Sequence, residues 1–303
     1  MLKDIYNIFF PAKPLITVNR NLPINYFKEL QYHEEIKSKG YVVIKNVVTD
    51  KNISFLQDVF DKLQKFPEYS IDDKFQNSGR YRSSEIRNFV MENIGAFSKQ
   101  FLSQIFNEAL YDTNTTGAFQ IKPPSKVSEL NPHQDAPVID EMNYNALFVW
   151  IPLCDITEQN GAVYVLPKSH LFGNYQRSLN VPWMFEKHTK MLWKHMIPVY
   201  LEKGDILCWD SALIHASSPN LSDKMRIAIT TTILPKDFKM VEFFKDKNTP
   251  NDSVERYEVE RSFWENDDIM KRPTCPPNKF IGYEKLVYNN TISKSALIDL
   301  IRK

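Results

Sequence analysis

Six short apolar segments, divided by turn residues, fill the middle of this 303-residue chain and restrict the folds open to it. Each segment is about as long as a β-strand, and most are rich in the β-branched and aromatic residues that favour strands. They are Gly117 to Lys122, Asn145 to Leu153, Ala162 to Leu166, Ile197 to Leu201, Asp205 to Trp209 and Met225 to Leu234. Such a series predicts a mainly β fold with a double-sheet jelly-roll or cupin-like core.

Helical patterns precede this strand-rich region. Pro23 suits a first helical turn, and the apolar spacing after it predicts a helix over residues 24–39. A β-branched run at residues 41–47 predicts a strand, and Asp50 can cap the helix that follows. A third apolar pattern predicts a helix over residues 97–111. We expect these helices to flank the core on one side.

Two further regions depart from the strand pattern. Residues 171–196 are long for a connection and carry Trp183 and Trp193. This segment is either a helical insertion or lid over a cavity, or a stretch whose aromatic side chains only pack. The tail at residues 236–303 mixes charged residues with prolines and ends in an amphipathic run. We expect the tail to extend the domain, without forming a domain of its own.

Charge and cysteine content exclude several classes of protein. Lys and Arg total 38 against 37 Asp and Glu, so a net charge of +1 gives no reason to expect nucleic acid or an anionic membrane as a partner. Cys154, Cys208 and Cys275 lie far apart, which argues against a disulfide framework or a structural zinc site. The apolar runs of residues 1–22 are too short for a signal peptide or a membrane span, so we expect a cytoplasmic protein.

The segment Asn131-Pro-His-Gln-Asp135 places a histidine and a carboxylate two residues apart. On an extended chain the side chains of His133 and Asp135 point to the same face and can bind one ion. A third ligand from elsewhere would complete a set of two histidines and one carboxylate, which leaves positions for O2 and a bidentate co-substrate on Fe(II). The His-X-Asp pattern alone is weak evidence, because such short motifs also occur by chance.

A second group of residues strengthens the case for a site. His215 follows an apolar strand and can supply the third ligand. Arg226 comes eleven residues later, inside the apolar segment that ends at Leu234. Its neighbours predict that the guanidinium points into the barrel, where it needs an anionic partner. A dicarboxylate co-substrate or a structural salt bridge could supply that anion.

Together the motifs resemble those of one family. They are Gly40-Tyr-Val-Val-Ile44, His133-Gln-Asp135, Ile151-Pro-Leu-Cys-Asp155, Gln159-Asn-Gly-Ala162, Leu166-Pro-Lys-Ser-His170, Gly204-Asp205, His215 and Arg226. In this order they resemble the phytanoyl-CoA dioxygenase (PhyH) family of Fe(II)/2-oxoglutarate-dependent oxygenases. The resemblance implies a double-stranded β-helix and a single oxygenase domain over residues 1–303. Its core would span about 40–235, with a helical preface at 1–39, an extension at 236–303 and a possible lid at 171–196.

The resemblance also implies roles for particular residues. His133, Asp135 and His215 resemble the iron ligands of the family, and 2-oxoglutarate and O2 would bind beside them. Arg226 resembles the residue that binds the distal carboxylate of 2-oxoglutarate, and Ser217 resembles its hydroxyl partner. Two weaker candidates for contacts to co-substrate or substrate lie on the strand before the iron motif, and an exposed strand face is the alternative for both. These two are Gln120 and Lys122.

One departure from the family pattern concerns a turn. The family commonly has Pro-Gly-Ser-His where this chain has Pro167-Lys-Ser-His170, so Lys168 replaces the glycine. We expect His170 to be structural, because the three-ligand set is already complete. Asp135 argues against halogenation, since related halogenating enzymes replace this carboxylate with a small residue.

The expected reaction is hydroxylation of an unactivated C–H bond in a small molecule, either amino-acid-like or a biosynthetic intermediate, with succinate and CO2 as co-products. Desaturation, cyclisation, epimerisation and acyl-CoA hydroxylation remain open, as does a non-catalytic, cupin-like ligand-binding protein. Four arginines could bind an anionic group of the substrate or could lie on the surface: Arg80, Arg82, Arg87 and Arg177. The oligomeric state stays undetermined.

Overall fold

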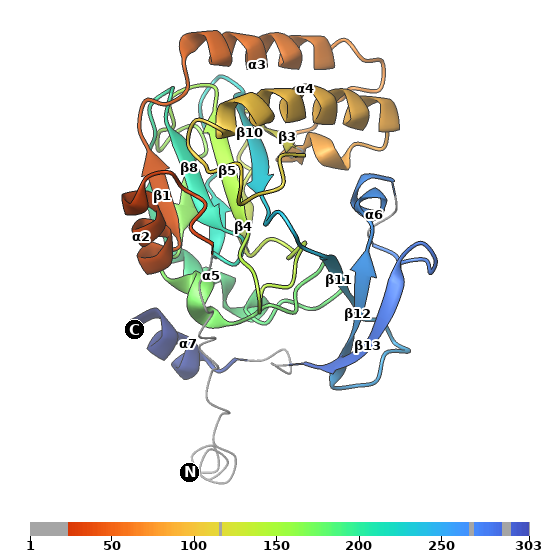
Figure 1. Ribbon diagram of the computed structural model, residues 1–303. Helices are drawn as coiled ribbons and strands as arrows, with labels where there is room; N and C mark the ends of the chain where they lie inside the picture. Colours follow the sequence, from red (N-terminus) through yellow and green to blue (C-terminus); the bar gives the residue numbers. More distant parts are fainter. Residues whose placement is uncertain (1–23, 115–116, 267–269, 287–291, 303) are drawn as a thin grey trace.

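Two antiparallel sheets form the core of the computed structural model, which describes residues 24–114, 117–266, 270–286 and 292–302 (Figure 1). The larger sheet has the order β1 (Tyr41–Ile44), β8 (Ile206–Asp210), β5 (Leu147–Pro152), β10 (Arg226–Ile233), β3 (Gly117–Lys122) and β2 (Gln76–Asn77). The smaller sheet has the order β4 (Leu130–His133), β9 (His215–Ser217), β6 (Val163–Val165) and β7 (Ile197–Val199). The expected mainly β fold with a jelly-roll core is confirmed.

Side chains alternate between the two faces along each strand of the larger sheet, so its two faces pack against different layers. Val149 and Ile151 of β5 pack with the helices, whereas Trp150 between them packs with β6 and β7 of the smaller sheet. The helix layer consists of α2 (Leu30–Lys39), α3 (Asp50–Leu63) and α4 (Ser84–Leu102). Figure 1 shows α3 and α4 stacked on the outer side of the sheet. The inner face of the larger sheet therefore remains available for a site between the sheets.

The helices begin and end at different residues from those predicted. Helix α2 begins at Leu30, because Phe27 before it lies in an extended segment that pairs with Phe106. The ring centroids of Phe27 and Phe106 are 4.8 Å apart. Helix α3 is confirmed, but Thr49 caps it, and Asp50 is its first residue. The predicted helix at 97–111 is wrong, because α4 begins after the Ser83 cap and ends at Leu102. Pro23 lies outside the described residues.

The six predicted strands are all present as β3, β5, β6, β7, β8 and β10, with ends that differ by up to two residues. The tail also contains a separate three-stranded antiparallel sheet of β11 (Met240–Phe244), β12 (Ser253–Val259) and β13 (Lys279–Lys285). It further contains α6 (Arg261–Asn266) and α7 (Lys294–Arg302). No described helix is long and apolar enough to cross a lipid bilayer.

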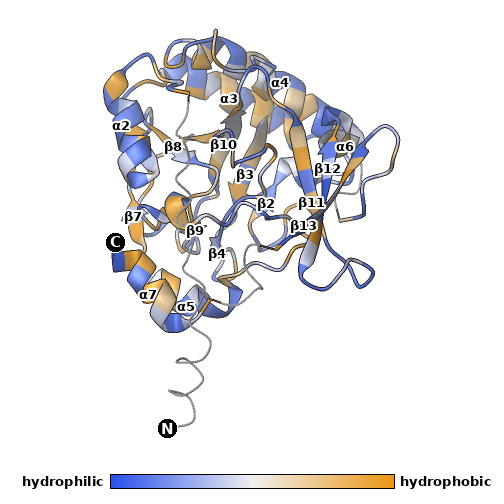
Figure 2. Cartoon of the chain, turned by 60° about the horizontal axis from the view of Figure 1, so that its bottom comes forward, coloured by the Kyte–Doolittle hydropathy of each residue, from blue (hydrophilic) through white to orange (hydrophobic). Residues whose placement is uncertain are grey.

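The insertion at residues 171–196 is a packed segment with little regular structure. It contains Leu171 and Phe172 from the end of the turn η2 (Ser169–Phe172), the turn η3 (Glu186–His188) and helix α5 (Thr189–Trp193). Its apolar side chains form one cluster with Leu297 and Leu300 of α7, and α5 and α7 lie side by side in Figure 2. The cluster members from the insertion include Phe172, Met184, Phe185 and Leu192. The C-terminal helix therefore holds the insertion in place.

Gly40 joins α2 to β1 at a position where a side chain does not fit. It ends α2 in a left-handed conformation with φ of 87°, and its N–H donates to the Ile36 carbonyl. A Cβ atom at this position would lie 2.5 Å from Nδ1 of His170. His170 is buried, and its Nε2 lies 3.3 Å from the Lys37 carbonyl oxygen. These contacts give His170 a place in the packing of α2.

We predict that Gly40→Ala lowers the free energy of unfolding by about 2 kcal/mol or more, because it adds left-handed strain to the overlap with His170. Urea unfolding measures the change. Lys39→Ala is the matched control, since the Lys39 side chain forms an exposed ion pair with Glu35. This substitution should change the free energy of unfolding by less than about 0.5 kcal/mol. Equal effects of the two substitutions would contradict this account.

Glu242 of β11 connects the C-terminal sheet to the insertion. Its side chain is 2% exposed and shares a hydrogen bond with Ser178. Burial raises the pKa of the Glu242 carboxyl from 4.5 to about 8, against the opposing effect of that hydrogen bond. Between these two values the folded protein keeps a proton that the unfolded chain releases. Glu242 therefore makes the protein less stable as the pH rises through this range.

We predict that Glu242→Gln stabilises the protein increasingly from pH 5 to pH 8, by at most about 1.4 kcal/mol for each pH unit. The amide needs no proton to remain neutral, so the penalty disappears. Urea unfolding of both proteins at several pH values measures the trend. Glu258→Gln is the control, because Glu258 pairs with exposed Lys239 at 3.0 Å. A constant difference between Glu242→Gln and wild type across this pH range would refute the prediction.

Candidate active site

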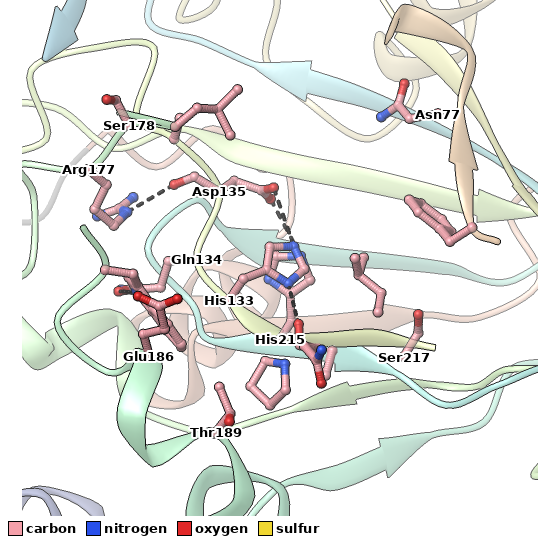
Figure 3. A pocket seen from close by; sticks show the side chains of 18 of the residues that line it. Asn77, His133, Gln134, Asp135, Arg177, Ser178, Glu186, Thr189, His215 and Ser217 are labelled. Carbon is pink, nitrogen blue, oxygen red and sulfur yellow. Dashed lines mark hydrogen bonds and ion pairs between the residues drawn. The ribbon is translucent and has the colours of Figure 1, made fainter. Parts of the chain in front are cut away.

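The pairing of two short strands brings the candidate metal ligands together. Strands β4 and β9 are antiparallel, and His133 lies opposite His215 in their register. Asp135 follows β4 and directs one carboxylate oxygen toward each histidine, at 3.8 Å from Nε2 of His133 and 3.5 Å from Nε2 of His215. The three ligand atoms lie within 4.8 Å of one another (Figure 3). One metal ion can therefore be bound by all three side chains.

Backbone carbonyls set the tautomer of both histidines. Nδ1 of His133 lies 2.8 Å from the Asn131 carbonyl oxygen, and Nδ1 of His215 lies 3.0 Å from that of Leu213. A carbonyl only accepts, so Nδ1 carries the proton and Nε2 keeps its lone pair for a metal. Burial, and then the neighbouring His215, lower the pKa of His133 to about 4. The imidazole is therefore neutral at physiological pH, as metal binding requires.

The donor set fits Fe(II). Two imidazole nitrogens and one carboxylate are the ligand set typical of Fe(II) oxygenases, and these three side chains would hold such an ion while other positions stayed open for ligands. The triad contains no cysteine, although a thiolate would favour a softer metal or zinc. His170 makes its contacts at α2, so the structural role expected for this histidine agrees with its position.

The triad lies in a cavity of about 1060 Å³ between the two sheets. The insertion contributes a wall that runs from Asn174 to Thr189, and a role of this segment as a lid stays a prediction. The tail contributes Trp264 from α6. Other lining side chains include Phe75, Asn77, Arg80, Gln120, Trp183 and Trp209. The tail therefore does more than extend the domain, because it supplies part of the cavity wall.

Arg226 begins β10 and lies 1% exposed in the same cavity. Within the part of the chain that the structure describes, its Nε and Nη1 have no hydrogen-bond partner. The ring of Trp150 lies 5.2 Å from the guanidinium carbon. Burial lowers the pKa of Arg226 to about 10, so the group is still charged at neutral pH. A buried cation without an anion is unfavourable, and the distal carboxylate of 2-oxoglutarate would satisfy it.

Lys122 lies opposite Arg226 in the register of β3 and β10. It is fully buried and donates to Oγ of Ser217 and to the Ser218 carbonyl, each at 2.6 Å. Burial, and then the nearby Arg226 charge, lower the pKa of Lys122 to about 6. The exposed strand face considered for Lys122 is therefore wrong. Gln120 lines the cavity, and its Oε1 accepts from Nε1 of Trp150 at 3.0 Å.

Two motif residues outside the triad support this subsite. Gly161 has φ of 85°, and a Cβ atom there would lie 2.4 Å from Cδ of Lys122. Asn220 is buried, and its Nδ2 donates to the carbonyls of Lys122 and Lys224 at 2.9 and 2.7 Å. It thereby fixes the turn that leads into β10. The glycine of the Asn-Gly-Ala motif and this asparagine position Lys122 and the start of β10, where Arg226 lies.

The four arginines considered for substrate binding lie in three different environments. Arg80 is exposed and lines the cavity, and Arg82 is exposed outside its lining. Arg87 donates to the carbonyls of Tyr81 and Arg82. Arg177 is neither at the surface nor free for a substrate anion, because it is 4% exposed and pairs with Glu141 at 2.7 Å. That pairing corrects the expectation for Arg177.

Several residues that build the site carry no recognisable signal in the sequence. Glu141 follows the iron motif by six residues in a segment without strand or helix periodicity. Trp264 lies in the tail, 129 residues beyond Asp135, so only the fold brings it to the cavity.

Lys168 stands where the family has glycine, and its φ of 66° shows why glycine is favoured there.

We predict that Asp135→Ala weakens Co(II) binding by more than about 100-fold, because it removes the charged ligand of the triad. Co(II) replaces Fe(II) in this measurement because its visible spectrum reports coordination directly. Asp58→Ala on the exposed face of α3 is the control and should bind Co(II) as wild type does. Unchanged Co(II) affinity in Asp135→Ala would show that the triad does not bind metal.

Comparisons with known proteins agree with this geometry. A phytanoyl-CoA dioxygenase domain-containing protein 1 homolog from Dictyostelium discoideum is 25% identical over 47% of this chain and 54% of its own length. The Rattus norvegicus phytanoyl-CoA dioxygenase domain-containing protein 1 is 30% identical over 36% of this chain and 40% of its own length. The chain thus spans about half the length of the curated relatives it matches.

The fold has a solved counterpart in EctD from S. alaskensis, whose crystal structure contains 2-oxoglutarate and 5-hydroxyectoine. The TM-score is 0.51 at 18% identity, over 78% of this chain and 88% of that chain. The sequence model of the phytanoyl-CoA dioxygenase (PhyH) family matches residues 36–228, which include the triad and Arg226. The chain therefore belongs to the phytanoyl-CoA dioxygenase family of Fe(II)/2-oxoglutarate-dependent oxygenases.

Proposed function

We propose that this protein hydroxylates an unactivated C–H bond of a small molecule, using Fe(II), 2-oxoglutarate and O2. The observation that carries the proposal is Arg226, a buried cation without an anionic partner among the described residues, which lines the same cavity as the triad. A metal-dependent cupin without a co-substrate would not need this arginine. A non-catalytic relative would tolerate the loss of a ligand, yet His133, Asp135 and His215 converge.

The residues of the chain divide the work between binding and positioning. When bound, Fe(II) and 2-oxoglutarate supply the oxidation of a C–H bond by O2, with succinate and CO2 as co-products. His133, Asp135 and His215 would hold the metal from the side of β4 and β9. The backbone carbonyl partners would keep the proton of both histidines on Nδ1 and leave Nε2 free for the metal, and burial lowers the pKa of His133 so that this ligand is neutral.

Arg226, Lys122 and Ser217 would fix the distal carboxylate of the co-substrate. Arg226 offers its unpartnered Nε and Nη1, and charge-assisted bonds from a guanidinium are short and directional. The Ser217 hydroxyl lines the same cavity and accepts a hydrogen bond from Nζ of Lys122 at 2.6 Å. An incoming carboxylate also favours the protonated form of Lys122, because opposite charges stabilise each other in a buried site.

The remaining cavity suits a small molecule with polar groups. A volume of about 1060 Å³ holds the co-substrate and leaves room for a second ligand. The lining includes aromatic side chains, Trp183 from the insertion and Trp264 from α6, together with polar residues such as Asn77. An acyl-CoA would need several free cations, whereas the rim supplies Lys74 and Arg80. An amino-acid-like compound or a biosynthetic intermediate therefore fits the lining better.

The whole chain would function as one oxygenase domain. The tail supplies Trp264 to the cavity, and α7 packs on the insertion that forms the cavity wall. Removal of the tail would therefore open the substrate cavity as well as shorten the chain. We place the protein in the reducing cytoplasm, a location supported by its three free cysteines.

The proposal is tested by substrate-dependent conversion of 2-oxoglutarate to succinate. The purified Fe(II) protein is incubated with amino acids, acyl thioesters and natural-product intermediates, and succinate is measured. We expect turnover with a small molecule, none with Asp135→Ala, and impaired turnover with Arg226→Ala. Product mass distinguishes added oxygen from desaturation, cyclisation or epimerisation. An absence of succinate with every substrate, together with no binding of 2-oxoglutarate, would refute the proposal.

We also predict that Arg226→Met raises the free energy of unfolding of the ligand-free protein by about 1 kcal/mol, because it removes a buried unpaired charge. Wild type already saturated with Co(II) should gain about 2.7 kcal/mol more from 2-oxoglutarate at 100 times its dissociation constant. Arg226→Met should gain much less from the same addition. Urea unfolding measures both effects.

Arg272→Met is the matched control for this experiment. Arg272 forms two 2.9 Å bonds with Glu255, which is 3% exposed. Its loss should destabilise the protein by about 2 kcal/mol without changing the response to 2-oxoglutarate. If Arg226→Met destabilised the ligand-free protein as much as Arg272→Met, Arg226 would already have a structural partner.

A further inference from the structure

The insertion wall of the cavity is hydrogen-bonded to the segment that carries the candidate metal ligands. Arg177 of the insertion donates from Nε to the carbonyl oxygen of Asp135 at 2.9 Å, as Figure 3 shows. We infer that Arg177 and Glu141 form a positioning pair that holds Asp135 at the metal and couples it to this wall. The inference rests on the proposed function of the triad as a metal site.

The guanidinium of Arg177 has all its donors engaged. Nη1 and Nη2 bind the two carboxylate oxygens of Glu141 at 2.7 and 2.8 Å. Nη1 also donates to the Asn174 carbonyl, and Nη2 to the Ser211 carbonyl at 3.4 Å. The side chains are 4% and 0% exposed for Arg177 and Glu141. A planar fork held at every N–H fixes where its Nε points, so the contact with Asp135 is well defined.

Asp135 needs such an external restraint because it lies beyond the regular strand. β4 ends at His133, and its pairing with β9 is irregular between Leu130 and His133. Among the described residues, the hydrogen-bond donor to the Asp135 carbonyl is Arg177. Fixing this carbonyl restrains the backbone of Asp135, and through it the direction of the carboxylate between the two histidines. Arg177 thus acts through Asp135 and does not touch the metal.

Gln134 links the same two segments from the opposite side. Its side chain points away from the triad, as expected for the residue between two ligands on an extended chain. Nε2 of Gln134 donates to the Ala212 carbonyl at 2.6 Å. Its Oε1 accepts from Nδ2 of Asn174 at 3.2 Å and from Nε1 of Trp183 at 3.1 Å. Trp183 lines the cavity, so the bonds run from the substrate wall to the ligand segment.

The chain offers a matched pair for separating positioning from simple stabilisation. Arg272 also forms a bidentate pair with a buried glutamate, Glu255, at 2.9 Å for each bond. Neither residue lines the cavity. A lysine at either position keeps the charge but loses the fork geometry, so both substitutions should weaken the fold. Only the one at Arg177 should alter the metal site.

The first test measures Co(II) affinity in Arg177→Lys and Arg272→Lys, without 2-oxoglutarate or substrate. We expect Arg177→Lys to bind Co(II) about 10-fold more weakly, the scale seen when a residue that orients a ligand is lost. Arg272→Lys should stay within about twofold of wild type. Should Arg177→Lys prove unstable, Glu141→Gln tests the same pair, and we expect weaker Co(II) binding there too. Wild-type affinity in a folded variant of Arg177 or Glu141 would overturn the inference.

The second test uses amide hydrogen exchange in residues 174–183. If the wall and Asp135 are coupled, Co(II) binding at the triad should slow exchange in this segment of the wild-type protein. In Arg177→Lys the slowing should be reduced, whereas Arg272→Lys should retain it. A wild-type protein that binds Co(II) without protecting residues 174–183 would contradict the coupling.

These tests also separate the inference from the proposed function. Co(II) affinity and hydrogen exchange need neither the co-substrate nor a substrate, so a failed succinate assay would refute the oxygenase proposal and leave the positioning pair intact. Loss of Co(II) binding in Asp135→Ala gives the reference for a removed ligand. If that variant bound Co(II) normally, the metal site itself would be wrong and the inference would fail with it.

Discussion

The antiparallel pairing of β4 with β9 is the constraint on which the rest of the site depends. It places His133 opposite His215, and it places Ser217 at the other end of the same pair, opposite Leu130. Side chains alternate between faces along a strand, so a shift of one residue would move His215 out of the cavity. Ser217 then joins the triad to the larger sheet through its bond with Lys122. The metal ligands and the buried basic side chains of Lys122 and Arg226 thus form one unit across both sheets.

The burial of two basic side chains close together is electrostatically unfavourable within this unit. Arg226 and Lys122 are buried and lie opposite each other on β10 and β3, and burial, followed by the charge of Arg226, lowers the pKa of Lys122. The opposite face of the same sheet packs on α3 and α4, and this large apolar core stabilises the fold independently of the site. A dicarboxylate that enters between the sheets relieves the penalty, so part of its affinity comes from a charge already fixed in place.

The core of the site could be predicted because its signals are local. His133 and Asp135 share a face through the two-residue period of a strand, and Arg226 lies in an apolar run that predicts burial. The six predicted strands were predictable from their apolar runs, whereas β4 and β9 carry polar side chains such as Asn131 and His215. Arg177 could not be placed, because its partner Glu141 lies 36 residues earlier in an irregular segment. The tail sheet was missed because β12 carries several charged residues that the fold pairs, such as Glu255 with Arg272.

The central claim is that the triad and Arg226 form one site for a metal and a dicarboxylate. Anaerobic titration of the Fe(II) protein with 2-oxoglutarate and with pyruvate tests it most directly, through the visible absorption that Fe(II) gains when a 2-oxo acid binds. Pyruvate has the metal-binding end but lacks the distal carboxylate. The account predicts that 2-oxoglutarate binds at least about 100-fold more tightly, and that Arg226→Ala removes most of this preference. Equal affinities for the two acids in the wild-type protein would contradict it.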